Sequence, residues 1–341
     1  MRTLTETRSD YQASREFRNG QCENAARLTE KCLHCGGRLE ESEGGLFDTR
    51  FGVEGRYEGR HCRDCGLEQL FPIPDRPSLK ALYESHYNFG GERGTLYTRL
   101  RERFLFSFLY RLWTRVDGDI SFHLRQGSGR LLDIGCNEGR GLRIYAGNGF
   151  QVEGLELNET AASVARKAGF AVHTDLLEHF YPQSSYDVAV LSNVLEHSLN
   201  PRQMLMDVHR LLANRGQVWI SCPNSRSWLR TALGRLWINW HVPFHISHFE
   251  TDTLRRLLSE SGYVDVEIRQ ITPALWVAQS LIACFFAREG KKTRQLRNPF
   301  LTLLLITLVR FIFFPVLWAG NKLGRGDCLL AMGTKGSACG S

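Results

Sequence analysis

Short apolar runs alternate with amphipathic stretches through the middle of the chain. Leu131–Ile134 ends at a glycine turn, and Arg140–Gly147 follows as a predicted helix. A second apolar run, Val152–Glu156, closes on a carboxylate. This order of strand, glycine loop, helix and strand is the repeating unit of an α/β sheet.

The same alternation continues to residue 334. Pro201 predicts the first turn of a helix, because proline is favoured there. After Thr251 three leucines, Leu254, Leu257 and Leu258, share one helical face, and Gly262 predicts the helix end. Five more strands are predicted, within Ala171–Leu176 and at Tyr186–Asn193, Gln217–Asn224, Val264–Ile268 and Cys328–Thr334.

The positive charge is concentrated in one segment. The chain has 341 residues, is 43% hydrophobic and carries a net charge of +7. Residues 288–325 hold eight basic residues and one acid, 8 − 1 = +7, so the rest is balanced with 35 of each sign. A uniformly basic surface is therefore not expected, and neither is nucleic-acid binding.

The glycine loop and Glu156 together predict a site for an adenosine-type cofactor. Glycine lets backbone approach a ligand closely, and an acid about 20 residues further on can hold a ribose diol. A dinucleotide fingerprint would read Gly-x-Gly-x-x-Gly. Here Asp133 precedes Gly135, and Asn137 takes the second glycine position, where its tolerance of left-handed backbone preserves the turn. The early acid suits a cationic ligand end.

These motifs resemble those of class I S-adenosylmethionine-dependent methyltransferases, whose first motif commonly reads Asp-x-Gly-x-Gly-x-Gly. The resemblance covers residues 129–270 and implies an α/β, Rossmann-like sheet with helices on both faces. It also implies S-adenosylmethionine as cofactor, with the glycine loop at the aminocarboxypropyl group, Glu156 on the ribose and Asp175 facing adenine. The implied cofactor-binding residues are Asp133, Gly135, Cys136, Asn137, Gly139, Glu156, Leu157, Asp175, Leu176, Ser192 and Asn193.

Two Cys-x-x-Cys pairs predict a structural zinc site. Cys32 and Cys35 are separated from Cys62 and Cys65 by 26 residues, and a glycine follows each pair. Four thiolates at this spacing can enclose a tetrahedral zinc ion as a zinc ribbon, and the metal would supply folding energy that so small a polar piece lacks. Redox dithiols and plain loop cysteines are the alternatives. The flanking His34 and His61 are expected to be spectators, although a Cys₃His site stays open.

Residues 32–90 resemble the zinc-containing front end of some bacterial sugar and polysaccharide methyltransferases. The resemblance rests on Cys65–Pro74 and the aromatic residues that follow. It implies a module that caps the cofactor domain and helps to shape the acceptor pocket. Tyr83, Tyr87 and Tyr97 could line that pocket, or could equally be core residues.

An apolar insert precedes the last predicted strand. It holds two apolar stretches, Ala274–Phe286 and Phe300–Trp318, joined by the basic connector Arg288–Arg297. The second stretch has 19 residues, about 28 Å as a helix, close to the bilayer core of about 30 Å. Arg310 disfavours simple insertion and Pro315 predicts a kink. Because the chain must return to the sheet, a single crossing is excluded, which leaves a shallow hairpin, an interfacial helix pair, or helices packed on the domain or a second copy.

Several histidines are candidate general bases for a hydroxyl acceptor. His197 follows the fourth strand, and His241, His245 and His248 lie in the loop after the fifth. The prediction names His197, His245 and His248 as catalytic, since loops at the carboxyl ends of parallel strands meet at the ligand. Each alone could also be structural, and Glu196 is expected to orient its loop.

Three functions follow from these features. The first is O-methylation of a glycan or lipid-linked sugar at the cytoplasmic membrane face, by a peripheral or monotopic enzyme that contacts anionic lipid. The second is methylation of an isoprenoid quinone or another lipid. The third is a zinc-ribbon adaptor with a non-catalytic cofactor domain, which the intact Asp133, Gly135, Glu156 and Asp175 disfavour. A homo-oligomer stays open.

The expected organisation has five parts. A polar, disordered tail without a secretory signal covers residues 1–29, and the zinc-binding module covers 30–75. A helical connector or cap spans 76–128. The methyltransferase domain combines 129–270 with 327–336, around the apolar insert at 271–326.

Overall fold

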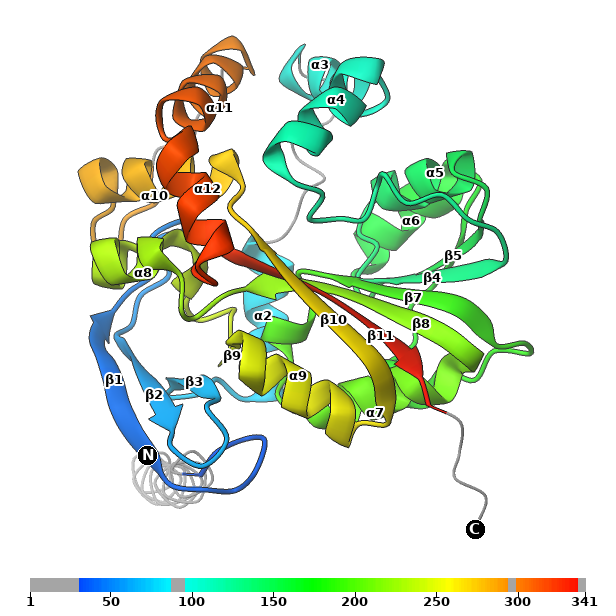
Figure 1. The fold of residues 1–341 in the computed structure, drawn as a ribbon, viewed down its shortest axis with the longest axis horizontal. Coiled ribbons are helices and arrows are strands. Elements are labelled where there is room, and N and C mark those ends of the chain that lie inside the picture. Colours follow the sequence, from blue (N-terminus) through cyan, green and yellow to red (C-terminus); the bar gives the residue numbers. More distant parts are fainter. Residues whose placement is uncertain (1–30, 87–95, 294–298, 337–341) are drawn as a thin grey trace, which may run out of the picture.

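A computed structural model describes residues 31–86, 96–293 and 299–336. The predicted N-terminal tail, Tyr87, Arg294 and Arg297 lie outside the described residues, as does the side chain of Tyr97. The chain forms a large sheet with helices on both faces, a small sheet, and a group of helices at one end (Figure 1).

The large sheet has seven strands in the order β10-β11-β8-β7-β4-β5-β6. Neighbouring strands from β8 to β6 run parallel, and β11 is antiparallel to both β8 and β10. The strands are β4 (Arg130–Ile134), β5 (Gln151–Leu155), β6 (Ala171–His173), β7 (Tyr186–Ser192), β8 (Leu212–Pro223), β10 (Tyr263–Ile271) and β11 (Cys328–Lys335).

Four helices cover the two faces of this sheet. Figure 1 shows α5 (Arg140–Gly147) and α6 (Glu159–Lys167) on one face, with α7 (Pro201–Leu211) and α9 (Thr251–Glu260) on the other. This arrangement confirms the predicted fold class. Strands β4 and β7 are buried almost throughout, as expected for parallel strands covered on both sides. Local signals fix the helix starts, since the Asn158 and Asn200 side chains cap α6 and α7.

The small sheet joins the cysteine-containing segment to the large domain. Its order is β1-β2-β3-β9, with β1 (Leu39–Leu46), β2 (Tyr57–Cys62), β3 (Glu68–Phe71) and β9 (Ser247–His248). The first three strands are consecutive, whereas β9 belongs to the loop between β8 and α9. Glu68 pairs with His248 and Gln69 with Ser247. Cys32, Cys62, Cys65 and Leu67 share one apolar core with residues of the large sheet, so the two parts form one packed unit.

Three helices connect the sheets. They are α2 (Arg76–His86), α3 (Leu96–Leu105) and α4 (Phe108–Asp117). A short helix, α8 (Trp228–Leu233), and single 3-10 turns at Leu177–His179, Leu195–His197, Gly234–Leu236 and Ile238–Trp240 complete the described elements between the strands.

Three apolar helices lie between β10 and β11. They are α10 (Ala274–Phe286), α11 (Pro299–Ile312) and α12 (Phe314–Lys322). The chain leaves the sheet at Ile271 and returns at Cys328, which pairs with it directly. The predicted kink is present: α11 and α12 meet at 65°, with Pro315 in the first turn of α12. Among the described helices none alone is long and apolar enough to cross a bilayer, although the bent pair satisfies both criteria together.

Candidate functional site

The glycine loop between β4 and α5 has the backbone of a ligand-binding turn. Gly135, Asn137 and Gly139 all have positive φ, at 73°, 51° and 78°. Asn137 therefore adopts the left-handed conformation that the sequence predicted for it. A Cβ at Gly139 would lie 2.7 Å from the Cβ of Ala165, so only glycine fits there.

The Glu156 carboxylate organises this loop. One oxygen accepts a hydrogen bond from the Asn137 amide at 2.9 Å, and the other accepts from the Asn158 amide at 2.8 Å. The hydrogen bond to Asn137 thereby links the end of β5 to the turn after β4. Each carboxylate oxygen keeps a second lone pair, so the group can still accept from a ribose diol, as its predicted role requires.

Asp133 lies beneath the loop as a buried carboxyl group. Burial, and secondarily the charge of Glu156, raise the pKa of Asp133 to about 7. A cation bound beside it would favour the charged form and lower that pKa. The ammonium of an aminocarboxypropyl group is such a cation.

Affinity for S-adenosylmethionine is expected to increase with pH between 6 and 7.5. Below about pH 7 Asp133 is mainly neutral and cannot pair with the ligand ammonium, whereas above it the carboxylate can. Over one pH unit the change approaches about tenfold, while the ammonium itself stays charged below about 7.7. Calorimetry across this range checks the slope. An Asp133→Asn variant should show a flat profile, and an equal slope in that variant would assign the effect to another group.

The remaining predicted cofactor residues lie at the carboxyl ends of neighbouring strands. Leu157 and Leu176 expose large apolar side chains after β5 and β6, where an adenine ring would cover them. Ser192 ends β7, and its hydroxyl donates to the carbonyl of Ile120. The others, Cys136, Asp175 and Asn193, follow β4, β6 and β7 respectively. Sequence reasoning missed the segment at Ile120–Ser121, which precedes β4 without any recognisable motif.

Two of the predicted catalytic histidines, His197 and His245, form a cluster with His241. The rings of His197 and His245 have centroids 4.6 Å apart, and His241 lies 4.9 Å from His245. Burial lowers the pKa of His197 to about 4 and holds the pKa of His245 well below its usual range. Both imidazoles are therefore neutral near pH 7. The His197 Nδ1 lies 2.6 Å from the hydroxyl of Tyr83 on α2. This contact joins the cluster to residues 32–86, the front segment that contains the four cysteines, the first three strands of the small sheet and α2.

His248 is placed differently from the other two predicted bases. It lies on β9 in the small sheet, and its ring packs on Trp240 at 4.8 Å. Its ring nitrogens are buried and have no hydrogen-bond partner within the described residues. This position suits a packed structural side chain better than contact with an acceptor.

Glu196 does not orient its loop through its side chain, contrary to expectation. The carboxylate is fully buried, and neither oxygen forms a hydrogen bond to a described residue. Instead its backbone carbonyl accepts from the Ile246 amide at 2.8 Å. Burial raises the pKa of Glu196 to about 8.

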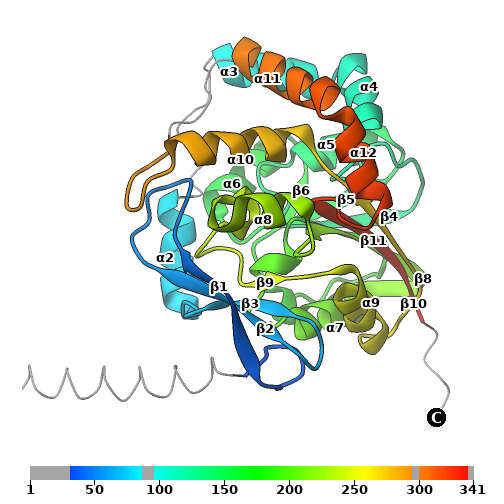
Figure 2. The ribbon, with the colours of Figure 1, turned by 60° about the vertical axis from the view of Figure 1, so that its left-hand side comes forward.

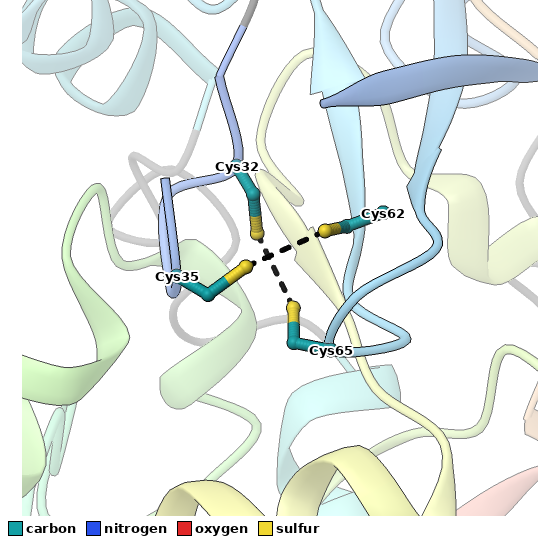
Figure 3. A group of neighbouring side chains, drawn as sticks. All are labelled: Cys32, Cys35, Cys62 and Cys65. Carbon is teal, nitrogen blue, oxygen red and sulfur yellow. Dashed lines mark hydrogen bonds between the residues drawn. The ribbon is translucent and has the colours of Figure 1, made fainter. Parts of the chain in front are cut away.

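The four predicted metal-binding cysteines converge on one point (Figure 3). Sγ of Cys32 lies 3.4 Å from Sγ of Cys65, and Cys35 lies 3.5 Å from Cys62. None forms a disulfide. A tetrahedral ion with bonds of about 2.3 Å needs sulfurs about 3.8 Å apart, so the set fits zinc after a small expansion. His34 contacts Glu260 at 3.2 Å and does not belong to the set.

Comparison with known proteins relates this fold to one enzyme family. The family described as "Methyltransferase domain" matches residues 97–268. A "Probable S-adenosylmethionine-dependent methyltransferase" of Mycobacterium tuberculosis is 32% identical over 140 residues, 40% of this chain and 49% of that protein. A "Ubiquinone biosynthesis O-methyltransferase" of Erwinia tasmaniensis is 29% identical over 33% of this chain and 51% of its own length.

The chain spans about half the length of these curated relatives. Among solved structures, a SAM-dependent methyltransferase from Archaeoglobus fulgidus is 19% identical. The match covers 67% of this chain and all of that one, with a TM-score of 0.40.

Proposed function

We propose an acceptor for this chain, which belongs to the methyltransferase-domain family and is an S-adenosylmethionine-dependent methyltransferase. The proposed reaction is methylation of a hydroxyl group of a glycan or lipid-linked sugar at the cytoplasmic face of a membrane. The observation that carries the membrane part is an exposed apolar surface at one end of the molecule. The acceptor class follows from the front module, whose resemblance is to sugar and polysaccharide methyltransferases.

The apolar surface is formed by α4, α11 and α12. Figures 1 and 2 show α3, α4 and α11 together at the end of the molecule away from the small sheet. Soluble proteins rarely expose so many large apolar side chains together. Those exposed on α4, α11 and α12 are Phe108, Leu109, Leu112, Val116, Phe300, Leu301, Leu303, Leu304, Leu308, Phe311, Ile312, Phe314, Val316 and Trp318.

Positive charge accompanies this surface, which favours an anionic bilayer over a protein partner as its occupant. Helices α3 and α4 contain five arginines and two acids, 5 − 2 = +3. Exposed Lys291 and Lys292 precede α11, and exposed Lys322 ends α12. Apolar burial with basic residues at the head groups is the usual design of an interfacial helix.

Contacts between residues 32–86 and the cofactor domain support the proposed capping role of this segment. Strand β3 pairs with β9, and Tyr83 contacts His197, so the segment reaches the loops that face a bound cofactor. We assign zinc at the four cysteines a structural role here, since all four positions of a tetrahedral ion are filled by protein.

A second acceptor class, an isoprenoid quinone, is favoured by one comparison. Several of the similar proteins are ubiquinone biosynthesis O-methyltransferases, among them those of Erwinia tasmaniensis, Klebsiella pneumoniae and Thiobacillus denitrificans. A quinone precursor would also be presented by a membrane. The apolar surface is therefore compatible with either acceptor class. Identifying the methylated product distinguishes a sugar acceptor from a quinone acceptor.

A labelled-methyl transfer screen tests the proposal. The full chain is incubated with tritiated S-adenosylmethionine and with separate lipid, lipid-linked sugar and polysaccharide fractions, and the labelled product is identified by mass spectrometry. Label as a methyl ether on a sugar supports the first acceptor. Label on a quinone ring oxygen would replace the sugar with a quinone as the proposed acceptor. Label on nitrogen or carbon would overturn O-methylation.

Binding to lipid vesicles is expected to depend on both charge and apolar contact. Replacing Lys291, Lys292, Arg294 and Arg297 with glutamine should weaken binding to anionic vesicles more than to neutral ones, since each basic residue contributes about 1 kcal/mol near an anionic surface. High salt should release the wild type only partly, because apolar burial persists when charge is screened. Vesicle flotation measures both effects. A wild type that stays soluble and monomeric without lipid or detergent would instead indicate packed helices with no membrane role.

A further inference from the structure

Three side chains beside the cofactor loop form a cluster of ligand atoms. Glu196 and His197 lie in the 3-10 turn after β7, and His245 lies in the loop before β9. Each offers one ligand atom, and the three atoms lie within 4.8 Å of one another. Glu196 and His245 are buried, whereas His197 is only partly covered. The cluster is therefore largely buried, with His197 as its most accessible member.

The Glu196 carboxyl group is buried and lacks polar partners within the described part of the chain. Both oxygens are buried without a hydrogen-bond partner among the described residues. The nearest titratable atom is His245 Nε2, at 3.9 Å from Oε1, which exceeds hydrogen-bond distance. Burying a carboxyl group without a hydrogen-bond partner costs free energy in either protonation state. A separation of this size leaves room for an ion bound by both groups.

The two imidazoles are held as metal ligands usually are. His245 Nδ1 lies 2.8 Å from the Asn239 carbonyl, which can only accept, so Nδ1 carries the proton and Nε2 keeps its lone pair toward Glu196. His197 Nδ1 lies 2.9 Å from the Phe244 carbonyl and 2.6 Å from the Tyr83 hydroxyl. In the tautomer that donates from Nδ1 to the carbonyl, Nε2 keeps a lone pair for a metal ion. Fixing one ring nitrogen on a backbone carbonyl is the common support for a metal-bound histidine.

We propose that Glu196, His197 and His245 bind one divalent transition-metal ion, separate from the four-cysteine site, and that this ion binds the acceptor hydroxyl. Two imidazoles and one carboxylate are a known ligand set for ions that keep open positions. The position fits, because β7 runs parallel to β4 and both end at the edge of the sheet that carries the glycine loop.

The role in methyl transfer rests on the proposed function, whereas the metal site rests on the cluster alone. On the ion the acceptor O–H bond breaks and its proton passes to solvent. The oxygen electron pair forms a bond to the sulfonium methyl carbon, and the carbon–sulfur bond breaks with its pair returning to sulfur. The products are a methyl ether and S-adenosylhomocysteine, with no change in oxidation state of the ion.

Manganese titration of the zinc-loaded full chain tests the site without turnover. Thiolates favour zinc and leave Mn²⁺ to oxygen and imidazole ligands, so free Mn²⁺ followed by electron paramagnetic resonance reports this cluster. We expect one equivalent bound by the wild type. Glu196→Gln should weaken binding by at least about tenfold, as loss of a ligand charge exceeds the effect of losing a supporting contact. His209→Gln, on α7 away from the cluster, should bind as the wild type does.

Glu196→Gln keeps the side-chain volume and replaces the buried carboxyl group with a neutral amide, so the variant is expected to fold. Mn²⁺ should raise the thermal midpoint of the wild type and leave that of the variant unchanged, since only binding to the folded state stabilises it. No saturable Mn²⁺ binding to the wild type, or equal affinity in the variant, would overturn the site. Metal binding without methyl transfer would instead refute the proposed function and leave the site standing.

Discussion

Replacing Cys62 and Cys65 with serine is expected to abolish zinc binding and unfold the small sheet. A structural zinc site contributes about 10–16 kcal/mol in isolated zinc-finger peptides, more than most domains have as total stability. A hydrogen bond with the neighbouring Cys65 thiol lowers the pKa of Cys32, which favours the thiolate form that zinc binds. The wild type should therefore contain one zinc ion that a thiol-blocking mercurial releases, and the variant none. Elemental analysis with a metallochromic dye measures both.

A matched control is Cys284→Ser, which changes a partly covered thiol on α10 away from the cluster. This variant should keep its zinc and its thermal midpoint. The double variant should also lose order in β9, because β3 is its pairing strand. A wild type without zinc, or a double variant that keeps it, would leave the four cysteines as ordinary core residues.

Arg310→Met is expected to destabilise the chain by about 3–5 kcal/mol, the usual cost of breaking a buried ion pair. The Arg310 guanidinium lies 3.7 Å from the Asp117 carboxylate, and both side chains are almost fully buried. Arg310 also donates to the Thr272 and Val116 carbonyls. Asp117 in turn accepts from the Ala274 amide at the start of α10. The pair thus ties α4, α10 and α11 together, and urea unfolding in mild detergent measures its loss.

The deficit of Arg310→Met should increase with pH. Burial raises the pKa of Asp117 to about 6, although Arg310 opposes the increase. Without Arg310 that pKa rises further above the unfolded value. A group with a raised folded-state pKa stabilises the fold at low pH and loses this effect as pH rises through that pKa. The deficit should therefore be larger at pH 8 than at pH 5.5, and adding Asp117→Asn should restore most of the stability. Equal deficits at both pH values would exclude Asp117 as the cause.

Local sequence patterns predicted the cofactor half of the molecule well. The helix Arg140–Gly147 has the bounds that the sequence gives it, and the last strand returns to the sheet as expected. These features depend on neighbouring residues: glycines with positive φ, a capping side chain, or an apolar run of strand length. The kink near Pro315 was predictable for the same reason.

Contacts between distant segments could not be predicted in this way. Strand β9 has two residues, too few for any periodicity, and it pairs with residues about 180 positions earlier in the chain. The contact of Tyr83 with His197 and the burial of Arg310 on Asp117 depend equally on tertiary packing. The enclosure of the Glu196 carboxyl group could not be predicted either, because it depends on residues from other segments of the chain.

The place of β11 in the sheet affects how the chain is synthesised. β11 lies between β8 and β10, yet the ribosome makes it after both, with the three apolar helices translated in between. At about 5–20 residues per second, the 56 residues from Thr272 to Asp327 take about 3–11 seconds. During that interval one edge of β8 is unpaired and β10 has no partner strand in the sheet, and such unpaired edges are where nascent chains misassociate. Slow codons or ribosome stalling within this stretch would therefore lower the yield of folded protein more than equal delays elsewhere.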